Sequence, residues 1–209
     1  PIREELVMSL MNFIGPRPNL LDPKSGANQK LIEVNHPILS NEDVEKIRKI
    51  ENFSSGDLKS FTLSICYNKK VNKQFKIADF IEEICEKAEN LINDKLCNII
   101  ILSDKDLDKN NVAIPALLAT SALHHHLIKK GLRTKVGLVV ETGEARRVHD
   151  LCLLAGYGAE AINPYLAFFT LSNIIKNNNQ NISESEAYTK YIKAVTKGML
   201  KVMSKMGIS

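Results

Sequence analysis

The sequence predicts an α/β protein built of βα repeats around a mainly parallel sheet. Two observations support this fold class. Four short runs are predicted to be strands, at residues 61–66, 97–102, 134–140 and 159–162. The runs at 97–102 and 134–140 have the apolar composition of strands that are covered on both faces. After each run the chain continues into a segment with the apolar spacing of a helix, which is typical of βαβ units with right-handed crossovers. The pattern also predicts helical extensions at both ends of the chain.

The first part of the chain is predicted to be a helix followed by a long loop. Residues 2–13 place their apolar side chains at helical spacing. The sequence GPRP at 15–18 ends this helix, and residues 19–37, rich in Pro, Gly and Asn, are predicted to be a loop. A short helix then begins at Ser40, because Asp43 follows at the spacing of a capping box.

The middle of the chain predicts two strands with a helix between them. Residues 61–66 alternate like a strand, and residues 75–93 repeat apolar side chains at intervals of three and four. The run at 97–102 is a second buried strand, and a polar loop at 103–111 follows its carboxyl end. A further helix begins with Pro115 in its first turn, where the missing N–H costs nothing.

The last part of the chain predicts two more strands, each with a helix behind it. Gly131 is placed to end the helix from Pro115, the strand at 134–140 follows, and a second helix runs to about Ala155. After the strand at 159–162, another helix begins at 163–164.

A long helix with an apolar stripe closes the sequence. Ser183 and Glu186 have the spacing of a capping box, and Gly207 is placed to end the helix.

The composition excludes several classes of function. The chain has 209 residues, of which 44% are hydrophobic and 25% charged, as in ordinary globular domains. No apolar run approaches the ~20 residues that cross a bilayer, so no membrane partner is expected. A formal net charge of +4 is too weak to indicate a nucleic-acid partner without a basic patch.

The cysteines are predicted to be buried and reduced. Cys66 and Cys97 fall in predicted strands, Cys85 and Cys152 fall in predicted helices, and none has CxxC spacing. No signal peptide is recognisable, so a cytoplasmic, reducing compartment is expected.

Three consecutive histidines, His124, His125 and His126, resemble a metal cluster but have the wrong spacing for one. Successive residues of a helix point about 100° apart, and zinc-binding helices use histidines four residues apart. We therefore expect structural roles or hydrogen bonds from these side chains, with a role at an interface as the alternative, and no metal site.

Polar residues follow three of the predicted strands. Asp104, Glu141 and Asn163 each stand at or just past the carboxyl end of a strand. Ligands of parallel α/β sheets collect outside these ends, whereas helix capping and loop hydrogen bonds use the same residue types. Both interpretations stay open, and the sequence contains no GxGxxG, GxxxxGK[ST] or GxSxG motif.

Several motifs in order resemble one known family. They are REELVMSLMNFIGPRPNLL at 3–21, HPILSNED at 36–43, IILSD at 100–104, AIPALLATSALHHHL at 113–127, GYGAEAINPYLAF at 156–168 and KGMLKVMSKMGIS at 197–209. Together they resemble the central domain of the large (alpha) subunit of glutamate synthase, with residues 1–209 forming that domain.

The resemblance implies an enzyme that makes L-glutamate from L-glutamine and 2-oxoglutarate. An amidotransferase domain releases ammonia with an N-terminal Cys nucleophile, and an FMN-binding domain reduces 2-iminoglutarate with electrons from an iron–sulfur cluster. By the same resemblance, the central domain joins these two partners, helps wall the ammonia path, and has a topology related to an incomplete (β/α) barrel. The electron donor, whether NADPH, NADH or ferredoxin, is recognised by a small electron-donating subunit or by other parts outside this sequence.

The chain lacks the parts of that family that carry its chemistry. It begins at Pro1 inside a predicted helix without a cap and ends at Ser209, so we expect a piece of a longer protein without the amidotransferase Cys, the flavin domain or the cluster cysteines. We expect no catalytic residue, no cofactor bound by this chain alone, no glutamate synthase activity, and exposed apolar surface around its first and last helices.

Met8 is the residue that the resemblance connects to a cofactor. A methionine of the family's central domain approaches the flavin and 2-oxoglutarate, and VMSL matches that position at Met8. A thioether can shape and desolvate such a site but cannot exchange protons. The alternative is that Met8 faces the core of an amphipathic helix.

A second function from another class remains possible on the residues alone. A small stand-alone α/β ligand-binding domain or enzyme would use Asp104, Glu141 and Asn163 at the carboxyl edge of the sheet. This interpretation predicts a closed pocket in which those three side chains converge.

Overall fold

A parallel sheet of four strands forms the centre of the computed structural model, which describes residues 7–19, 21, 30–68, 76–177 and 182–208. The strands are β3 (Ser60–Ser64), β5 (Ile99–Ser103), β7 (Gly137–Glu141) and β8 (Ala161–Asn163). Their order is β3-β5-β7-β8, and each neighbouring pair is parallel. The predicted α/β fold class and its four parallel strands are confirmed, with strand ends shifted by one to three residues.

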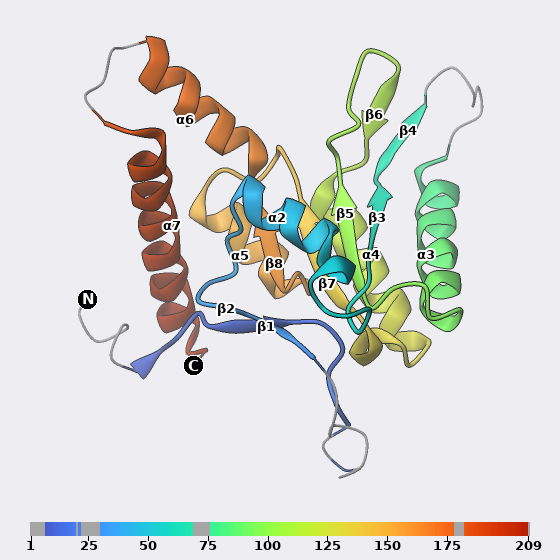
Figure 1. The fold of residues 1–209 in the computed structure, drawn as a ribbon. Helices are drawn as coiled ribbons and strands as arrows, with labels where there is room; N and C mark the ends of the chain where they lie inside the picture. The colour runs from blue at the N-terminus through green and yellow to red at the C-terminus, as the bar shows by residue number, and fades with distance from the viewer. Residues whose placement is uncertain (1–6, 20, 22–29, 69–75, 178–181, 209) are drawn as a thin grey trace.

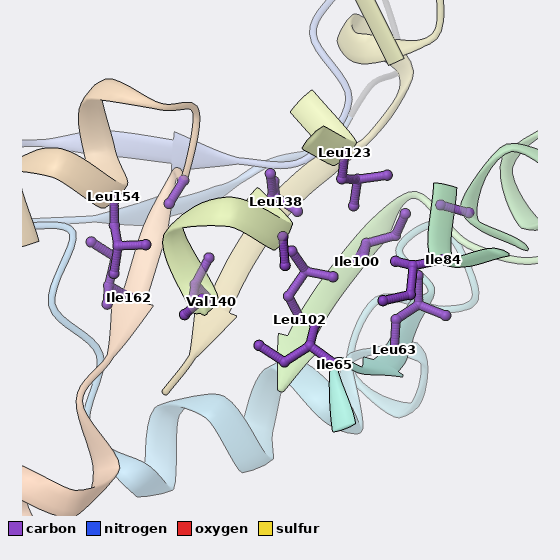
Figure 2. Packing of buried hydrophobic residues seen from close by; sticks show 14 of the residues in the cluster. Leu63, Ile65, Ile84, Ile100, Leu102, Leu123, Leu138, Val140, Leu154 and Ile162 are labelled. Carbon is purple, nitrogen blue, oxygen red and sulfur yellow. The ribbon is translucent and has the colours of Figure 1, made fainter. Parts of the chain in front are cut away.

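Helices pack on one face of this sheet and bury the larger core. They are α3 (Ile77–Asn93), α4 (Ala116–Lys129), α5 (Val148–Gly156) and α7 (Glu184–Met206). Alternate strand residues point toward them, as Figure 2 shows for Ile100, Leu102, Leu138 and Val140, which belong to the same buried cluster as Leu123 of α4. All five of these side chains are fully buried, so the continuous apolar runs of the sequence are explained by burial on both faces.

The other face of the sheet is covered by thinner structure. Helix α2 (Asn41–Arg48) crosses it in Figure 1. The side chains of Val44 and Ile47 pack there against Ile99 and Ile101 of β5.

Ser40 begins α2 as predicted. Its hydroxyl accepts the backbone N–H of Asp43, and the Asp43 carboxylate accepts the backbone N–H of Ser40. The predicted capping box is therefore confirmed.

The helix predicted over residues 2–13 is wrong at its carboxyl end. Residues 8–11 have no helical structure, and β1 (Asn12–Ile14) pairs antiparallel with β2 (Ile32–Val34), inside the predicted loop. Residues 1–6 lie outside the described part of the chain. Tertiary contacts override the helical spacing here, because the Asn12 amide donates to the Glu160 carbonyl at 2.8 Å and Ile14 is fully buried.

Short elements lie beside both edges of the sheet. An antiparallel ribbon of β4 (Cys66–Asn68) and β6 (Asn111–Ala113) extends beyond the carboxyl end of β3. Its strands begin where the predicted strand at 61–66 and the predicted loop at 103–111 end. On the other edge, Ile38 forms a parallel bridge with Ile162. Two single-turn 3₁₀ helices, η1 (Ile50–Asn52) and η2 (Arg133–Lys135), complete these connections.

The carboxyl-terminal helices follow the prediction closely. After α6 (Tyr165–Asn177), Ser183 caps α7 by accepting the backbone N–H of Glu186. Gly207 ends α7 in the left-handed conformation, with φ at 70°. The predicted helical extension is thus confirmed at this end of the chain.

Gly137 lets the β1 strand approach the sheet closely. A Cβ atom on Gly137 would lie 2.5 Å from the backbone nitrogen of Gly15 and 2.9 Å from its Cα. Backbone atoms cannot move aside as a flexible side chain can, so any side chain at Gly137 would push the hairpin off the sheet.

We expect Gly137→Ala to lower the free energy of unfolding by about 2 kcal/mol, since overpacking at a rigid contact costs about 1–3 kcal/mol. Urea denaturation measures this change. Gly156→Ala is the matched control, because an added Cβ there meets no atom within 4 Å. Equal stability of the two variants would contradict the close contact.

Candidate functional site

The carboxyl ends of the four parallel strands lie at one edge of the sheet. Ser64, Ser103 and Glu141 are aligned across the first three strands, and Asn163 is aligned with Glu141 on the fourth. The sheet therefore brings the predicted residues together at the edge where parallel α/β folds bind ligands.

Glu141 is a buried carboxylate held by two cations. Its side chain accepts from Nη2 of Arg48, at 2.9 and 2.8 Å to its two oxygens, and from Lys105 Nζ at 3.3 Å. The Ser103 hydroxyl also donates to it. Burial by itself raises the pKa of Glu141, but the hydrogen bonds from Ser103 and Arg48 and the nearby positive charges outweigh burial and lower this pKa. Glu141 is therefore an ionised structural anion.

Asp104 joins the loops that follow β5 and β7. Its carboxylate accepts the Thr142 hydroxyl at 2.6 Å and the Gly143 backbone N–H at 3.0 Å. Tyr165 approaches from α6, and burial together with a hydrogen bond to Asp104 raises the pKa of its phenol. Asp104 is buried and satisfied by these internal donors.

Asn163 ties the end of β8 to the start of α2. Its side-chain amide donates to the Leu39 carbonyl and to Asn41 Oδ1, both at 2.9 Å. Its own carbonyl oxygen, Oδ1, is buried without a partner in the described part of the chain. That oxygen can accept one further hydrogen bond.

These three side chains are neighbours on one edge, but their hydrogen bonds point in different directions. Glu141 binds α2 and the β5 loop, Asp104 binds the β7 loop, and Asn163 binds the segment before α2. Two cavities of about 590 Å³ each are lined by other residues. The sequence pattern gave no sign that Arg48 belongs to this site. Arg48 lies 93 positions from Glu141 in the chain, at the end of an ordinary amphipathic helix.

The histidines form hydrogen bonds with separate partners. His126 Nε2 lies 2.9 Å from Glu89 Oε2, and His124 Nδ1 accepts from Arg133 Nε at 3.0 Å. The predicted structural roles of these two side chains are confirmed. Among the described residues, no group of three or more His, Cys, Asp or Glu side chains is placed to hold a metal ion.

The cysteines are free thiols in the fold. Burial raises the pKa of Cys85 and Cys97 to about 11. Cys97 lies just before β5 and not within it. Thiols with such pKa values stay protonated and are poor nucleophiles.

Met8 lies in the irregular segment before β1. Its side chain is half-buried, whereas those of Val7 and Met11 beside it are exposed. At the other end of the chain, Met206 and Ile208 are exposed. Apolar side chains thus reach the surface near both ends of the described chain.

Replacing Arg48 with Met tests the ion pair. We expect Arg48→Met to lower the free energy of unfolding by about 3 kcal/mol, because removing one partner of a buried pair costs about 3–5 kcal/mol and Lys105 remains. Chemical denaturation at neutral pH measures the loss. The exposed Arg146 gives the control Arg146→Met, and the double variant Arg48→Met/Glu141→Gln should recover part of the stability. If Arg48→Met and Arg146→Met lowered the free energy of unfolding by similar amounts, the ion pair between Arg48 and Glu141 would be refuted.

Comparisons with known proteins identify the family. The family model "Glutamate synthase central domain" matches residues 1–209. The chain is 44% identical to the glutamate synthase [NADPH] large chain of Bacillus subtilis (strain 168), over 100% of this chain and 13% of that protein. It is 36% identical to the ferredoxin-dependent glutamate synthase of Antithamnion sp., over 100% of this chain and 14% of that protein. The chain thus spans about one-seventh of the length of these curated relatives.

A solved structure has a similar fold. A structure of flavocytochrome b2 with sulfite bound superimposes with a TM-score of 0.50 at 13% identity, covering 82% of this chain and 50% of that chain. At this identity the similarity concerns the fold alone, and it agrees with the predicted relation to an incomplete (β/α) barrel. None of the helices in the described part of the chain is long and apolar enough to cross a membrane. The match over all 209 residues shows that the chain belongs to the glutamate synthase central domain family.

Proposed function

We propose that residues 1–209 are the central connecting domain of a glutamate synthase, acting as a scaffold and as part of the ammonia path, without catalytic residues of their own. The parent enzyme would make L-glutamate from L-glutamine and 2-oxoglutarate by FMN-dependent reduction. The observation that carries this proposal is the engagement of Glu141 and Asp104 in internal ion pairs and hydrogen bonds.

The position of Arg48 explains why this edge is unsuited to catalysis. Barrel enzymes place their reacting groups at the carboxyl ends of the strands. Here α2 lies across one face of the sheet, and its last residue, Arg48, neutralises the carboxylate of Glu141 at that edge. A general acid or base must exchange its proton with a substrate, and Glu141 is buried and bound to two cations instead.

The partners follow from the length of the relatives. Because the chain covers 13% of the Bacillus subtilis large chain, the remaining parts would supply the amidotransferase domain and the FMN-binding domain with its iron–sulfur cluster. The relatives include NADPH, NADH and ferredoxin-dependent glutamate synthases, so a small electron-donating subunit or ferredoxin would complete the electron path. Cytoplasmic location is part of the same proposal.

One observation favours the stand-alone enzyme or ligand-binding domain as a second candidate. The unpartnered Oδ1 of Asn163 is a buried acceptor at the ligand-binding edge of the sheet, and a bound donor would satisfy it. The two candidates differ in what a conservative change at Asp104 does to turnover.

Asp104→Asn in the full parent protein separates these candidates. We expect glutamate synthase turnover per folded molecule to stay within about twofold and the melting temperature to fall, because the change removes a charge that accepts buried hydrogen bonds. A loss of about 100-fold or more would indicate acid–base chemistry at Asp104. Asp94→Asn, on the exposed end of α3, is the control and should change neither quantity.

Met8 is the residue that we propose to lie against the flavin and 2-oxoglutarate. Its half-buried side chain and the exposed Val7 and Met11 form an apolar segment suited to packing on a neighbouring domain. A flexible thioether can fill such a contact and exclude water from it.

Met8→Ala tests this placement in the parent protein. We expect a shifted flavin absorption spectrum and a KM for 2-oxoglutarate raised about tenfold, because truncation opens the desolvated contact. Met8→Leu preserves the volume and should restore both values. An unchanged spectrum and KM in Met8→Ala would assign the residue to packing within this domain.

A further inference from the structure

A basic cavity opens at the amino-terminal edge of the sheet, opposite the edge that carries Glu141. Its volume is about 590 Å³, within the range of ligand sites. Five basic side chains from separate segments of the chain line it: Arg17, Lys30, Lys59, Lys95 and Lys135. Asp57 is the acidic side chain in the lining. The cavity's excess of positive charge equals the formal net charge of +4 of the whole chain.

Two of these cations have no acidic partner in the described part of the chain. Lys30 pairs with Asp57 at 2.6 Å, and Lys59 lies 3.9 Å from a glutamate of η1. No ion pair forms at Lys95 or Lys135 among the described residues. The carboxyl end of α3 accounts for Lys95 through the helix dipole, but it does not explain why lysines from other segments gather at the same cavity.

The floor and the backbone of the cavity indicate which anion fits it. Pro16, Ile92 and Cys97 contribute apolar surface between the charged side chains. The backbone N–H groups of Arg17 and Gly56 already donate to the carbonyls of Thr134 and Glu51. Phosphate sites rely on such backbone donors, so this cavity is better suited to a carboxylate that carries an apolar neighbour.

We infer that this cavity docks an acidic segment of the same parent chain, with an apolar side chain on its floor and Asp or Glu residues against Lys95 and Lys135. The inference rests on the proposed function, in which this chain is one domain of a longer protein. Exposed ion pairs are individually weak and screened by salt. A tethered segment has a high effective concentration, so pairs of this kind suffice for a partner in cis but are weak for a separate protein.

Carbodiimide cross-linking of the intact parent enzyme tests the contact, because this reagent joins a lysine amine to a carboxylate that touches it. We expect mass spectrometry to find links from Lys95 or Lys135 to an Asp or Glu elsewhere in the same chain. Hydrogen exchange on the same sample should show protected amides at residues 56–59, 92–98 and 134–135, with protection that falls as salt is raised.

Charge variants give the matched controls. Lys95→Glu/Lys135→Glu should lower that protection about tenfold, because two attractions become repulsions. Lys95→Arg/Lys135→Arg should abolish the cross-links and keep the protection, since arginine retains the charge without a reactive amine. Lys193→Glu/Lys197→Glu on α7 should change neither result.

The other outcomes overturn the inference in distinguishable ways. Cross-links to a second copy or to another subunit would show that a different partner occupies the cavity. Rapid hydrogen exchange without cross-links would show that the cavity is open to solvent. Protection that appears only on adding inorganic phosphate would make it a small-anion pocket. These measurements use parent enzyme that has normal turnover and an unchanged Asp104. Their outcome is therefore independent of the Asp104→Asn test of the proposed function.

Discussion

The carboxylate of Glu141 cannot be buried at the end of β7 without a cation, and this requirement fixes the position of α2. Arg48 supplies the charge from the last residue of that helix. The pair therefore decides which element covers the second face of the sheet. With α2 in place, Val44 and Ile47 close the smaller core, and residues 37–39 are positioned to bridge with β8.

The same arrangement explains the difference between this domain and a barrel enzyme. A barrel leaves its carboxyl-terminal edge accessible and builds its reaction site from the loops there. In this chain, the loops after β5 and β7 are joined by Asp104, and the end of β8 is joined to the α2 segment by Asn163. Groups that would otherwise bind a substrate hold the elements together here, which agrees with the proposed scaffold role.

The sequence predicted what depends on local pattern and missed what depends on distant contacts. Ser40 and Ser183 were identifiable as caps because their partners are three residues away. The β1 strand was missed because its burial depends on close packing between Gly15 and Gly137, which are far apart in the chain. The presence of Asp104, Glu141 and Asn163 at one edge followed from strand polarity, but Arg48 and the basic cavity became visible only in the folded chain.

The two faces of the sheet are covered unequally. Four helices and part of α6 bury one side, whereas α2, the β1–β2 hairpin and short segments that carry Leu39, Ile50 and Leu58 shield the other in the described chain. Local opening is easiest where few apolar contacts must break. Thermal fluctuations should therefore admit water to the thin side first. In the proposed parent enzyme, a motion passed between neighbouring domains would then travel through the hairpin more readily than through the helical side.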